Sequence, residues 1–343
     1  MAFAPGLRGG ARVIWFQFAI CVAVILFSGT RLSYYGDVIA EKSGLGRTWI
    51  GVILMASVTS LPELVTGISS VAFYDLPNIA VGDVLGSCMF NLLILAMLDI
   101  GRKTSTISSL AHNGHVLTAA FGVLLLGIAA GSILLADLIP AIGWFGLYSP
   151  LFLILYVVAM RLVFQFERAR SAGFISDAME GLQYSHLPGR AAYVRFSLHA
   201  LVIVAAATYL PHLGDEIATI TGLGRTFVGS VFIAVSTSLP EIVVSRAALQ
   251  MGAVDLAVGN VLGSNLFNVA ILAIDDIAYR QGPILAAVSP SHAITALAAI
   301  AMTAIVTVAL TYRSGKRVLL FSWESIGVTL VYMLASLALY VRR

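Results

Sequence analysis

Long apolar runs separated by short polar stretches dominate this chain, and they predict membrane-spanning helices. A spanning helix needs roughly 20 mostly apolar residues. Ten runs reach that length: residues 13–38, 48–73, 79–100, 113–133, 138–165, 194–218, 226–250, 256–278, 291–312 and 320–341. The one long polar stretch, residues 166–193, divides them into two groups of five.

Composition supports an integral membrane protein. Only 11% of the 343 residues are charged and 59% are hydrophobic, whereas a soluble chain carries roughly 25% charged residues. The net charge of +3 is small for this length and indicates no nucleic-acid partner. The lipid bilayer is the expected surrounding, and no obligatory protein partner or prosthetic group is indicated. The first run exceeds signal-peptide length and lacks an A-x-A site, so we expect a retained helix.

Two segments of the first half recur in the second half. The stretch "GLGRTWIGVILMASVTSLPELVTG" (44–67) aligns without a gap to "GLGRTFVGSVFIAVSTSLPEIVVS" (222–245), with 13 identities in 24 positions. Likewise "IAVGDVLGSCMFN" (79–91) matches "LAVGNVLGSNLFN" (256–268). The similarity covers the first three spans of each half and does not extend to the fourth and fifth.

The number of spans in each half fixes the expected geometry. Because five is odd, the second copy enters the membrane from the opposite side, an arrangement common in secondary transporters. We therefore expect an all-α membrane protein of ten transmembrane helices in two inverted five-helix repeats. The first repeat covers residues 1–165, the connecting loop 166–193, and the second repeat 194–343.

Basic residues predict the orientation. With the 166–193 loop on the cytoplasmic side, that side holds twelve Lys and Arg residues and the opposite side six. Cytoplasmic loops are enriched in Lys and Arg. The distribution favours a plasma (inner) membrane protein with both termini outside and the loop inside.

The repeated T-S-L-P-E segments place an irregular, oxygen-rich turn inside a spanning helix. Each proline removes a backbone donor, so Pro62 frees the carbonyl of Val58 and Pro240 that of Ser236. A free carbonyl in hydrocarbon is costly unless a partner satisfies it. A bound cation is one such partner.

A glutamate follows each proline. Glu63 and Glu241 lie four residues after Thr59 and Thr237, so each pair shares a helix face. A glutamate at the bilayer centre costs at least ~3 kcal/mol, and two close carboxylates do not both stay ionised without a cation between them. Ca²⁺ takes six to eight oxygen ligands in a flexible cage. The alternative is that both glutamates are protonated and only pack helices.

The third span of each half carries a polar stripe at i, i+4 and i+8. The two stripes are Asp83, Ser87 and Asn91, and Asn260, Ser264 and Asn268. Glycines beside the stripes form small-xxx-small pairs that let another helix approach closely: Gly82 and Gly86, and Gly259 and Gly263. The stripes indicate cation ligands, and interhelical hydrogen bonding is the alternative.

Paired T-S-L-P-E segments, each followed by G-[DN]-x-x-G-S-x-x-F-N, resemble the α-repeats of the sodium/calcium exchanger family within the cation/calcium antiporter superfamily. The resemblance implies that Ca²⁺ and Na⁺ share a midplane site. It implies these metal ligands: Glu63, Glu241, Thr59, Thr237, Ser60, Ser238, Ser87, Ser264, Asn91, Asn268 and the carbonyls of Ala56 and Ala234. It also implies that the first and sixth spans form a gate that slides over the other eight helices.

Two positions depart from the pattern. Asp83 stands where such repeats usually show Asn, as Asn260 does here, so a third carboxylate near the site would change its charge or take up protons. Asn268 stands where some family members carry Asp, a residue tied to potassium co-transport or protonation. Its absence argues against potassium dependence.

The sequence therefore predicts a non-enzymatic antiporter that exchanges Ca²⁺ for Na⁺ by alternating access. The alternative with the same fold is H⁺/Ca²⁺ exchange, and a cation channel and an intramembrane hydrolase are the rivals from other classes. Asp275 and Asp276 are expected at a solvated membrane edge, and Arg246 is expected to snorkel rather than pair with Glu241. The six histidines show no metal-ligand spacing.

Overall fold

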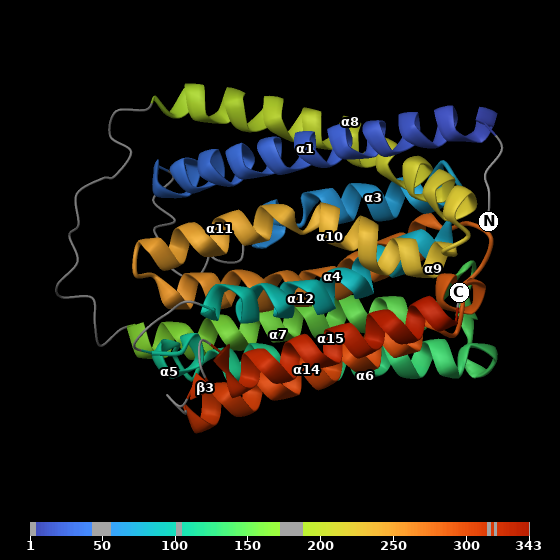
Figure 1. Ribbon diagram of the computed structural model, residues 1–343. Helices are drawn as coiled ribbons and strands as arrows, with labels where there is room; N and C mark the ends of the chain where they lie inside the picture. The colour runs from blue at the N-terminus through green and yellow to red at the C-terminus, as the bar shows by residue number, and fades with distance from the viewer. Residues whose placement is uncertain are drawn as a thin grey trace.

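The computed structural model describes residues 5–42, 56–100, 105–171, 188–313, 317–318 and 321–342, which are mostly helical (Figure 1). The helices are α1 (Pro5–Lys42), α3 (Leu61–Ala72), α4 (Pro77–Asp99), α5 (Ile107–Leu110), α6 (His115–Leu134), α7 (Tyr148–Ser171), α8 (Gly189–Thr221), α9 (Arg225–Phe227), π-helical η2 (Val228–Ile233), α10 (Ala234–Thr237), α11 (Leu239–Gln250), α12 (Val254–Ala278), α13 (Ile284–Ala287), α14 (His292–Tyr312) and α15 (Trp323–Val341).

Within the described residues, eight helices are long and apolar enough to cross a membrane, and a bent pair raises the number to nine. The bent pair is Arg225–Thr237 with Leu239–Gln250, which meet at 42°. The expected span 48–73 falls partly outside the described residues. Its described part is a short helical stretch over 56–59 followed by α3.

Two helices form the centre of the bundle. Of the most apolar 18-residue stretch of each helix, 94% is buried in α4 and 83% in α12. The corresponding shares are 22% in α7 and 17% in α8. In Figure 1, α1 and α8 run side by side along one face, and α6, α14 and α15 lie toward the opposite face. The start of α1 and the end of α15 lie at the same end of the bundle.

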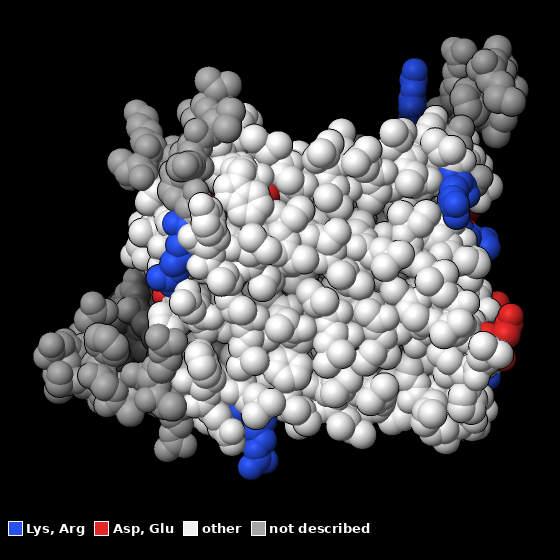
Figure 2. All heavy atoms as spheres, turned by 90° about the horizontal axis from the view of Figure 1, so that it is seen from below, with Lys and Arg blue, Asp and Glu red and all other residues white. Residues whose placement is uncertain are grey.

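The outer surface is largely uncharged. Figure 2 shows few Lys, Arg, Asp or Glu side chains between the two ends of the helices, and most of the visible charged side chains lie toward those ends. Large apolar side chains such as Ile154, Leu201 and Leu334 are exposed on the outer helices. Apolar side chains that face outward in this way are suited to contact with lipid.

Glycines on α4 confirm the expected close helix approach. A Cβ at Gly86 would lie 2.3 Å from the carbonyl oxygen of Ser230 in η2, and one at Gly82 would lie 3.0 Å from the Cα of Gly229. On α12, a Cβ at Gly263 would lie 3.2 Å from the Cβ of Ala56. Only small residues fit where these backbones meet.

The expected span 138–165 is wrong at its start, because α7 begins at Tyr148. A short 3₁₀ helix, η1 (Ala136–Leu138), and a hairpin of β1 (Ala141–Ile142) and β2 (Phe145–Gly146) precede it. Gly143, at φ +66°, allows the two-residue hairpin turn. β3 (Arg317–Val318) pairs antiparallel with β4 (Phe321–Ser322) in a second short sheet, and the fold is otherwise helical, as expected. Its helices extend into the predicted 166–193 loop, to Ser171 and from Gly189.

The expectation that Asp275 and Asp276 lie at a solvated edge is also wrong, because both are 0% exposed. The first hairpin and α13 cover this end of α12, and Trp144 Nε1 donates to the carbonyl of Ile277 at 2.9 Å. Asp276 accepts from Gly146 N at 2.8 Å, Tyr148 OH at 2.9 Å, Ile284 N at 2.6 Å and Ser149 Oγ. Four donors stabilise this carboxylate in its ionised form.

Contacts made by the two halves correspond beyond the segments that align in sequence. When the alignment of 79–91 with 256–268 is extended, Asp99 matches Asp276 and Ile107 matches Ile284. Asp99 accepts from Ile107 N at 2.8 Å, just as Asp276 accepts from Ile284 N. The two halves therefore close the ends of α4 and α12 with the same hydrogen bond.

The starts of the same two helices also make matching contacts. The start of α4 contacts the start of α14, since Asn78 Oδ1 accepts from Ser289 N at 2.8 Å. Under the same alignment Asp255 matches Asn78 and His112 matches Ser289. Asp255 Oδ1 accepts from His112 N at 2.7 Å. This is the equivalent hydrogen bond, made by the helix of the second half to a segment of the first half.

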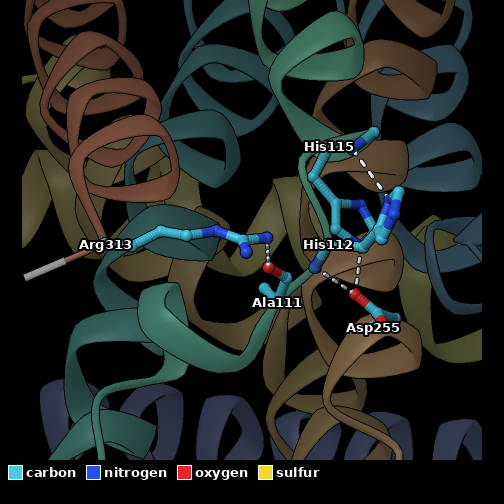
Figure 3. A network of polar contacts seen from close by, with 6 residues as sticks. Ala111, His112, His115, Asp255 and Arg313 are labelled. Carbon is cyan, nitrogen blue, oxygen red and sulfur yellow. Dashed lines mark hydrogen bonds and ion pairs between the residues drawn. The ribbon is translucent and has the colours of Figure 1, made fainter. Parts of the chain in front are cut away.

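Figure 3 shows this matching contact at the start of α12. Asp255 Oδ1 also lies 3.0 Å from His115 Nε2, while Arg313 donates to the carbonyl of Ala111 at 2.7 Å. The start of α12 thus meets the segment that follows α4, and the start of α4 meets the segment that follows α12. Helices α4 and α12 therefore run antiparallel.

Substituting Gly86 by Ala should destabilise the protein, because the new methyl group would collide with the Ser230 backbone. We expect a loss of about 1–3 kcal/mol in the free energy of unfolding. Gly122→Ala on α6 is the matched control, since nothing lies within 4 Å of its added Cβ. Thermal unfolding in detergent measures both. Equal unfolding midpoints for the two variants would contradict the close packing of α4 on η2.

Substituting Asp276 by Asn should also destabilise the protein. The amide nitrogen would face donors that now bind a carboxylate oxygen, and each unmatched buried group costs about 1–3 kcal/mol. Asp137→Asn, at an exposed position in the same region, is the control. Chemical unfolding followed by tryptophan fluorescence compares them. A variant as stable as wild type would show that the four hydrogen bonds are not formed.

Candidate cation-binding site

Both T-S-L-P-E segments break a helix at the same residue. Ser60 has φ −86° and ψ 13°, Ser238 has φ −87° and ψ 8°, and a proline follows in the first turn of α3 and of α11. Ser60 N still bonds to the carbonyl of Ala56, and Ser238 N to that of Ala234, each at 3.1 Å. The predicted irregular turn is therefore a one-residue break at the serine, immediately before each glutamate-bearing helix.

Each glutamate accepts a hydrogen bond from the serine of the other half. Ser238 Oγ donates to Glu63 Oε1 at 2.8 Å, and Ser60 Oγ donates to Glu241 Oε1 at 3.4 Å. All four side chains are 0% exposed. These crossed serine–glutamate bonds bring the two repeated segments together in the interior, as the sequence predicts.

The polar stripes of α4 and α12 complete the arrangement, again from the opposite half. Ser87 Oγ lies 3.5 Å from Thr237 Oγ1 and 3.4 Å from the Ala234 carbonyl. Ser264 Oγ lies 3.5 Å from Thr59 Oγ1, which bonds to the Ala56 carbonyl at 3.1 Å.

The result is two oxygen clusters around the crossed bonds, each drawn from both halves. One holds Ala234, Thr237, Ser238, Ser87 and Glu63. The other holds Ala56, Thr59, Ser60, Ser264 and Glu241.

Several buried oxygens at this place have no hydrogen-bond partner. They are Glu63 Oε2, Glu241 Oε2, Asp83 Oδ2, Asn91 Oδ1 and Asn268 Oδ1. Buried polar atoms are normally hydrogen-bonded, so a group of unpartnered ones needs an explanation. A cation bound among them would supply the missing partner.

Asp83 makes the site asymmetric. Its Oδ1 accepts from Thr237 Oγ1 at 2.8 Å, and the side chain is fully buried. At the matching position in the second half, Asn260 Nδ2 donates to Ser245 Oγ at 3.2 Å. One half therefore brings an additional carboxylate to the site, while the other half brings a neutral amide that bonds elsewhere.

Asn265 is a residue that the sequence reasoning missed. Its Oδ1 accepts from Asn91 Nδ2 at 3.0 Å, and its Nδ2 donates to the Cys88 carbonyl at 3.0 Å. These bonds join the middles of α4 and α12 and orient the Asn91 amide. The signal was a mismatch inside a repeated motif, because "GSNLFN" carries Asn265 where "GSCMFN" carries Cys88.

Carboxylates alone could not hold a metal ion here. No group of three or more His, Cys, Asp and Glu side chains in the described part of the chain is placed to bind one. The clusters instead combine carboxylate, hydroxyl, amide and backbone carbonyl oxygens. Such hard oxygen donors suit Ca²⁺ and similar cations.

Other polar residues of the repeats stay outside these clusters. Arg246 is exposed while Glu241 is fully buried, in keeping with a side chain that reaches toward the surface. Arg225, in the second G-L-G-R-T segment, pairs with Asp215 of α8. Positive φ at Gly222 and Gly224 ends α8 there. The first G-L-G-R-T copy, at 44–48, lies outside the described residues.

Comparison with solved structures supports this architecture. The H⁺/Ca²⁺ exchanger CAX superposes with a TM-score of 0.69 at 13% identity, covering 96% of this chain and 86% of that one. The sodium-calcium exchanger NCX_Mj, in crystals soaked with Na⁺ and Sr²⁺, superposes with a TM-score of 0.60 at 18% identity, covering 94% and 97%. At these identities the similarity establishes the fold.

Sequence comparison establishes the family. The inner membrane protein YrbG of Escherichia coli is 27% identical over 255 residues, which span 73% of this chain and 74% of YrbG. The family described as sodium/calcium exchanger protein matches residues 13–165 and 191–341, nearly the whole chain and both repeated segments. The family and its solved structural neighbours are exchangers rather than enzymes. The chain is a multi-pass integral membrane protein that belongs to the sodium/calcium exchanger family.

Proposed function

We propose that this protein exchanges Ca²⁺ for Na⁺ across the inner membrane by alternating access. The two ions would compete for the oxygen clusters around Glu63 and Glu241. The observation that carries the proposal is the pair of crossed serine–glutamate bonds, which leave one oxygen of each glutamate buried and without a partner. Ca²⁺ bound between the two carboxylates would balance their charge.

The proposed architecture is ten spans in two inverted five-helix repeats, residues 1–165 and 194–343, joined by a cytoplasmic segment 166–193. The antiparallel course of α4 and α12 supports the inversion. The start of α1 and the end of α15 lie at the same end of the bundle, which supports an even number of spans. The distribution of Lys and Arg supports termini on the outer side.

The proposed ligands are those of the two clusters together with Asn91, Asn268 and Asp83. These residues are buried, and both halves of the chain contribute to the set, which supports this assignment. Helices α1 and α8, which lie together along one face, would form the gate. Alternating access would then consist of their sliding over the remaining helices when a bound cation neutralises the site.

Proton/calcium exchange is the alternative that a specific observation favours. Asp83 adds a third buried carboxylate, so a site holding one Ca²⁺ would keep a negative charge unless it also took up a proton. The solved structure of an H⁺/Ca²⁺ exchanger has the same fold. Asn268, which is neutral, argues against potassium co-transport under either alternative.

Reconstituted vesicles distinguish Na⁺ from H⁺ as the counter-ion. An outward Na⁺ gradient imposed on protein-containing vesicles should drive ⁴⁵Ca²⁺ uptake, and replacing internal Na⁺ with choline should abolish it. A pH gradient of equal size should drive little uptake. Uptake driven by the pH gradient alone would establish the proton alternative. Flux that needs no counter-ion would instead indicate a channel.

Glu63→Gln and Glu241→Gln should each prevent calcium binding without preventing insertion into the membrane. Removing one of the two central carboxylates lowers the ligand charge, and we expect affinity to fall by at least ~100-fold. Equilibrium ⁴⁵Ca²⁺ binding to purified protein measures this. Glu216→Gln, an isosteric change on α8, is the control and should bind normally. Wild-type affinity in either central variant would refute the site.

A further inference from the structure

Asp275 is a buried carboxylate that neither the central clusters nor the Asp276 hydrogen bonds use. It lies near the end of α12, is 0% exposed, and neither of its oxygens has a hydrogen-bond partner. Its neighbour Asp276, by contrast, accepts four hydrogen bonds. An ionised buried carboxylate without a donor is unfavourable unless a cation accompanies it or a proton neutralises it.

The carboxylate of Asp275 lies against α3, at a glycine. A Cβ on Gly67 would lie 2.3 Å from Oδ2 and 2.5 Å from Oδ1 of Asp275, so both oxygens face the α3 backbone. Gly67 is four residues after Glu63, on the same face of the helix. At 1.5 Å per residue, the Asp275 contact is about 6 Å along α3 from the level of Glu63.

A cavity lies beyond Asp275, at the ends of α3 and α12, and Asp275 itself does not line it. The cavity measures about 500 Å³, with Val71 and Ala278 in its wall. Val71 is one turn beyond Gly67, and Ala278 is one turn beyond Asp275. The order along these helices is therefore the cavity, then Asp275, then Glu63.

The charges of this region favour a cation. Asp75 lines the cavity, and Asp275 lies between the cavity and the level of Glu63 along α3. Arg280 also lines the cavity and stacks its guanidinium on Trp144, 4.1 Å from the ring centroid, so the cavity wall holds one negative and one positive side chain. The uncompensated negative charge lies deeper, at Asp275 and at the central carboxylates, where it favours a cation.

Among the described residues, a buried carboxylate with neither oxygen hydrogen-bonded is present at this end of the bundle only. The alignment of the two halves matches Asp276 with Asp99, but it matches Asp275 with Leu98. Both halves therefore carry the hydrogen-bonded carboxylate, as Asp99 and Asp276. Only the second half carries the unpartnered one, Asp275. A function for Asp275 must therefore concern one side of the membrane.

We propose that Asp275 is a transit ligand that passes a partly hydrated metal cation between this cavity and the central site. The proposal rests on the proposed function of that site. Asp275 offers two oxygens, and neither is bonded to another residue. Ca²⁺ needs six to eight oxygens, so water from the cavity completes the shell. Weak binding of this kind lets an ion leave as readily as it arrives.

The test measures exchange from each side separately, in right-side-out and inverted membrane vesicles. In Asp275→Asn, we expect the half-saturating Ca²⁺ concentration on the cavity side to rise about 10-fold, because the local enrichment of cations is lost. The value on the opposite side should stay unchanged. Equilibrium ⁴⁵Ca²⁺ binding to the purified variant should stay within about twofold of wild type, since the central ligands remain.

Gly67→Ala tests the same point without removing a charge, because its methyl group displaces the Asp275 carboxylate. It should also raise the half-saturating Ca²⁺ concentration on the cavity side only. If Asp275→Asn does not fold, this variant alone decides the test. Asp255→Asn, at the opposite end of α12, is the control and should leave the cavity side unaffected.

Three results would overturn the transit assignment. Unchanged kinetics in both Asp275→Asn and Gly67→Ala would show that no cation passes this residue. Loss of pH dependence with an unchanged Ca²⁺ requirement would identify Asp275 as a proton carrier instead. Loss of equilibrium binding would place it in the central site. Failure of the proposed function would give a different result, because wild-type vesicles would then carry no Ca²⁺ from either side. That result would also rule out the transit role.

Discussion

Burial of two carboxylates in the interior of a membrane protein is the constraint that organises this structure. Neither Glu63 nor Glu241 has a cationic side chain beside it among the described ion pairs, and each is bonded to a serine of the other half. An unpaired charge in a medium of low polarity is strongly unfavourable. The fold therefore has to supply oxygen donors and leave a place for a positive charge. The helix breaks at Ser60 and Ser238 meet the first requirement, because each places a serine hydroxyl within hydrogen-bond reach of the glutamate of the other half.

Close helix packing is what brings these groups within reach of one another. Gly82 and Gly86 allow α4 to touch the backbone of η2, and this contact sets the Ser87 hydroxyl against the second T-S-L-P-E segment. A π-helical turn such as η2 is often found at a functional site, because it shifts the following residues around the helix axis. Here it directly precedes α10, which carries Ala234 and Thr237. The segment that packs against α4 therefore leads directly into the residues that face the Ser87 hydroxyl.

Much of this arrangement could be predicted from the sequence, because the relevant signals are local or repeated. Apolar runs located most helices, and the duplicated T-S-L-P-E context identified both glutamates and their neighbours. The hairpin before α7 was missed because Ala141–Gly146 is apolar enough to read as part of a span, although Gly143 marks its turn. The burial of Asp276 was missed because it depends on that hairpin folding back over α12, and the burial of Asp275 was missed because it depends on contact with α3 at Gly67. Asn265 was missed because only one half carries it. These features depend on contacts between distant segments, and a linear pattern does not contain them.

The crossed serine–glutamate bonds also bear on how such a chain could have arisen. A protein comprising only the first half would bury Glu63 without Ser238, and its Ser87 would face no Thr237. Two copies of that half could satisfy each other's groups if one copy were turned upside down relative to the other. The two halves are not interchangeable, because Asp83 in the first stands where Asn260 stands in the second.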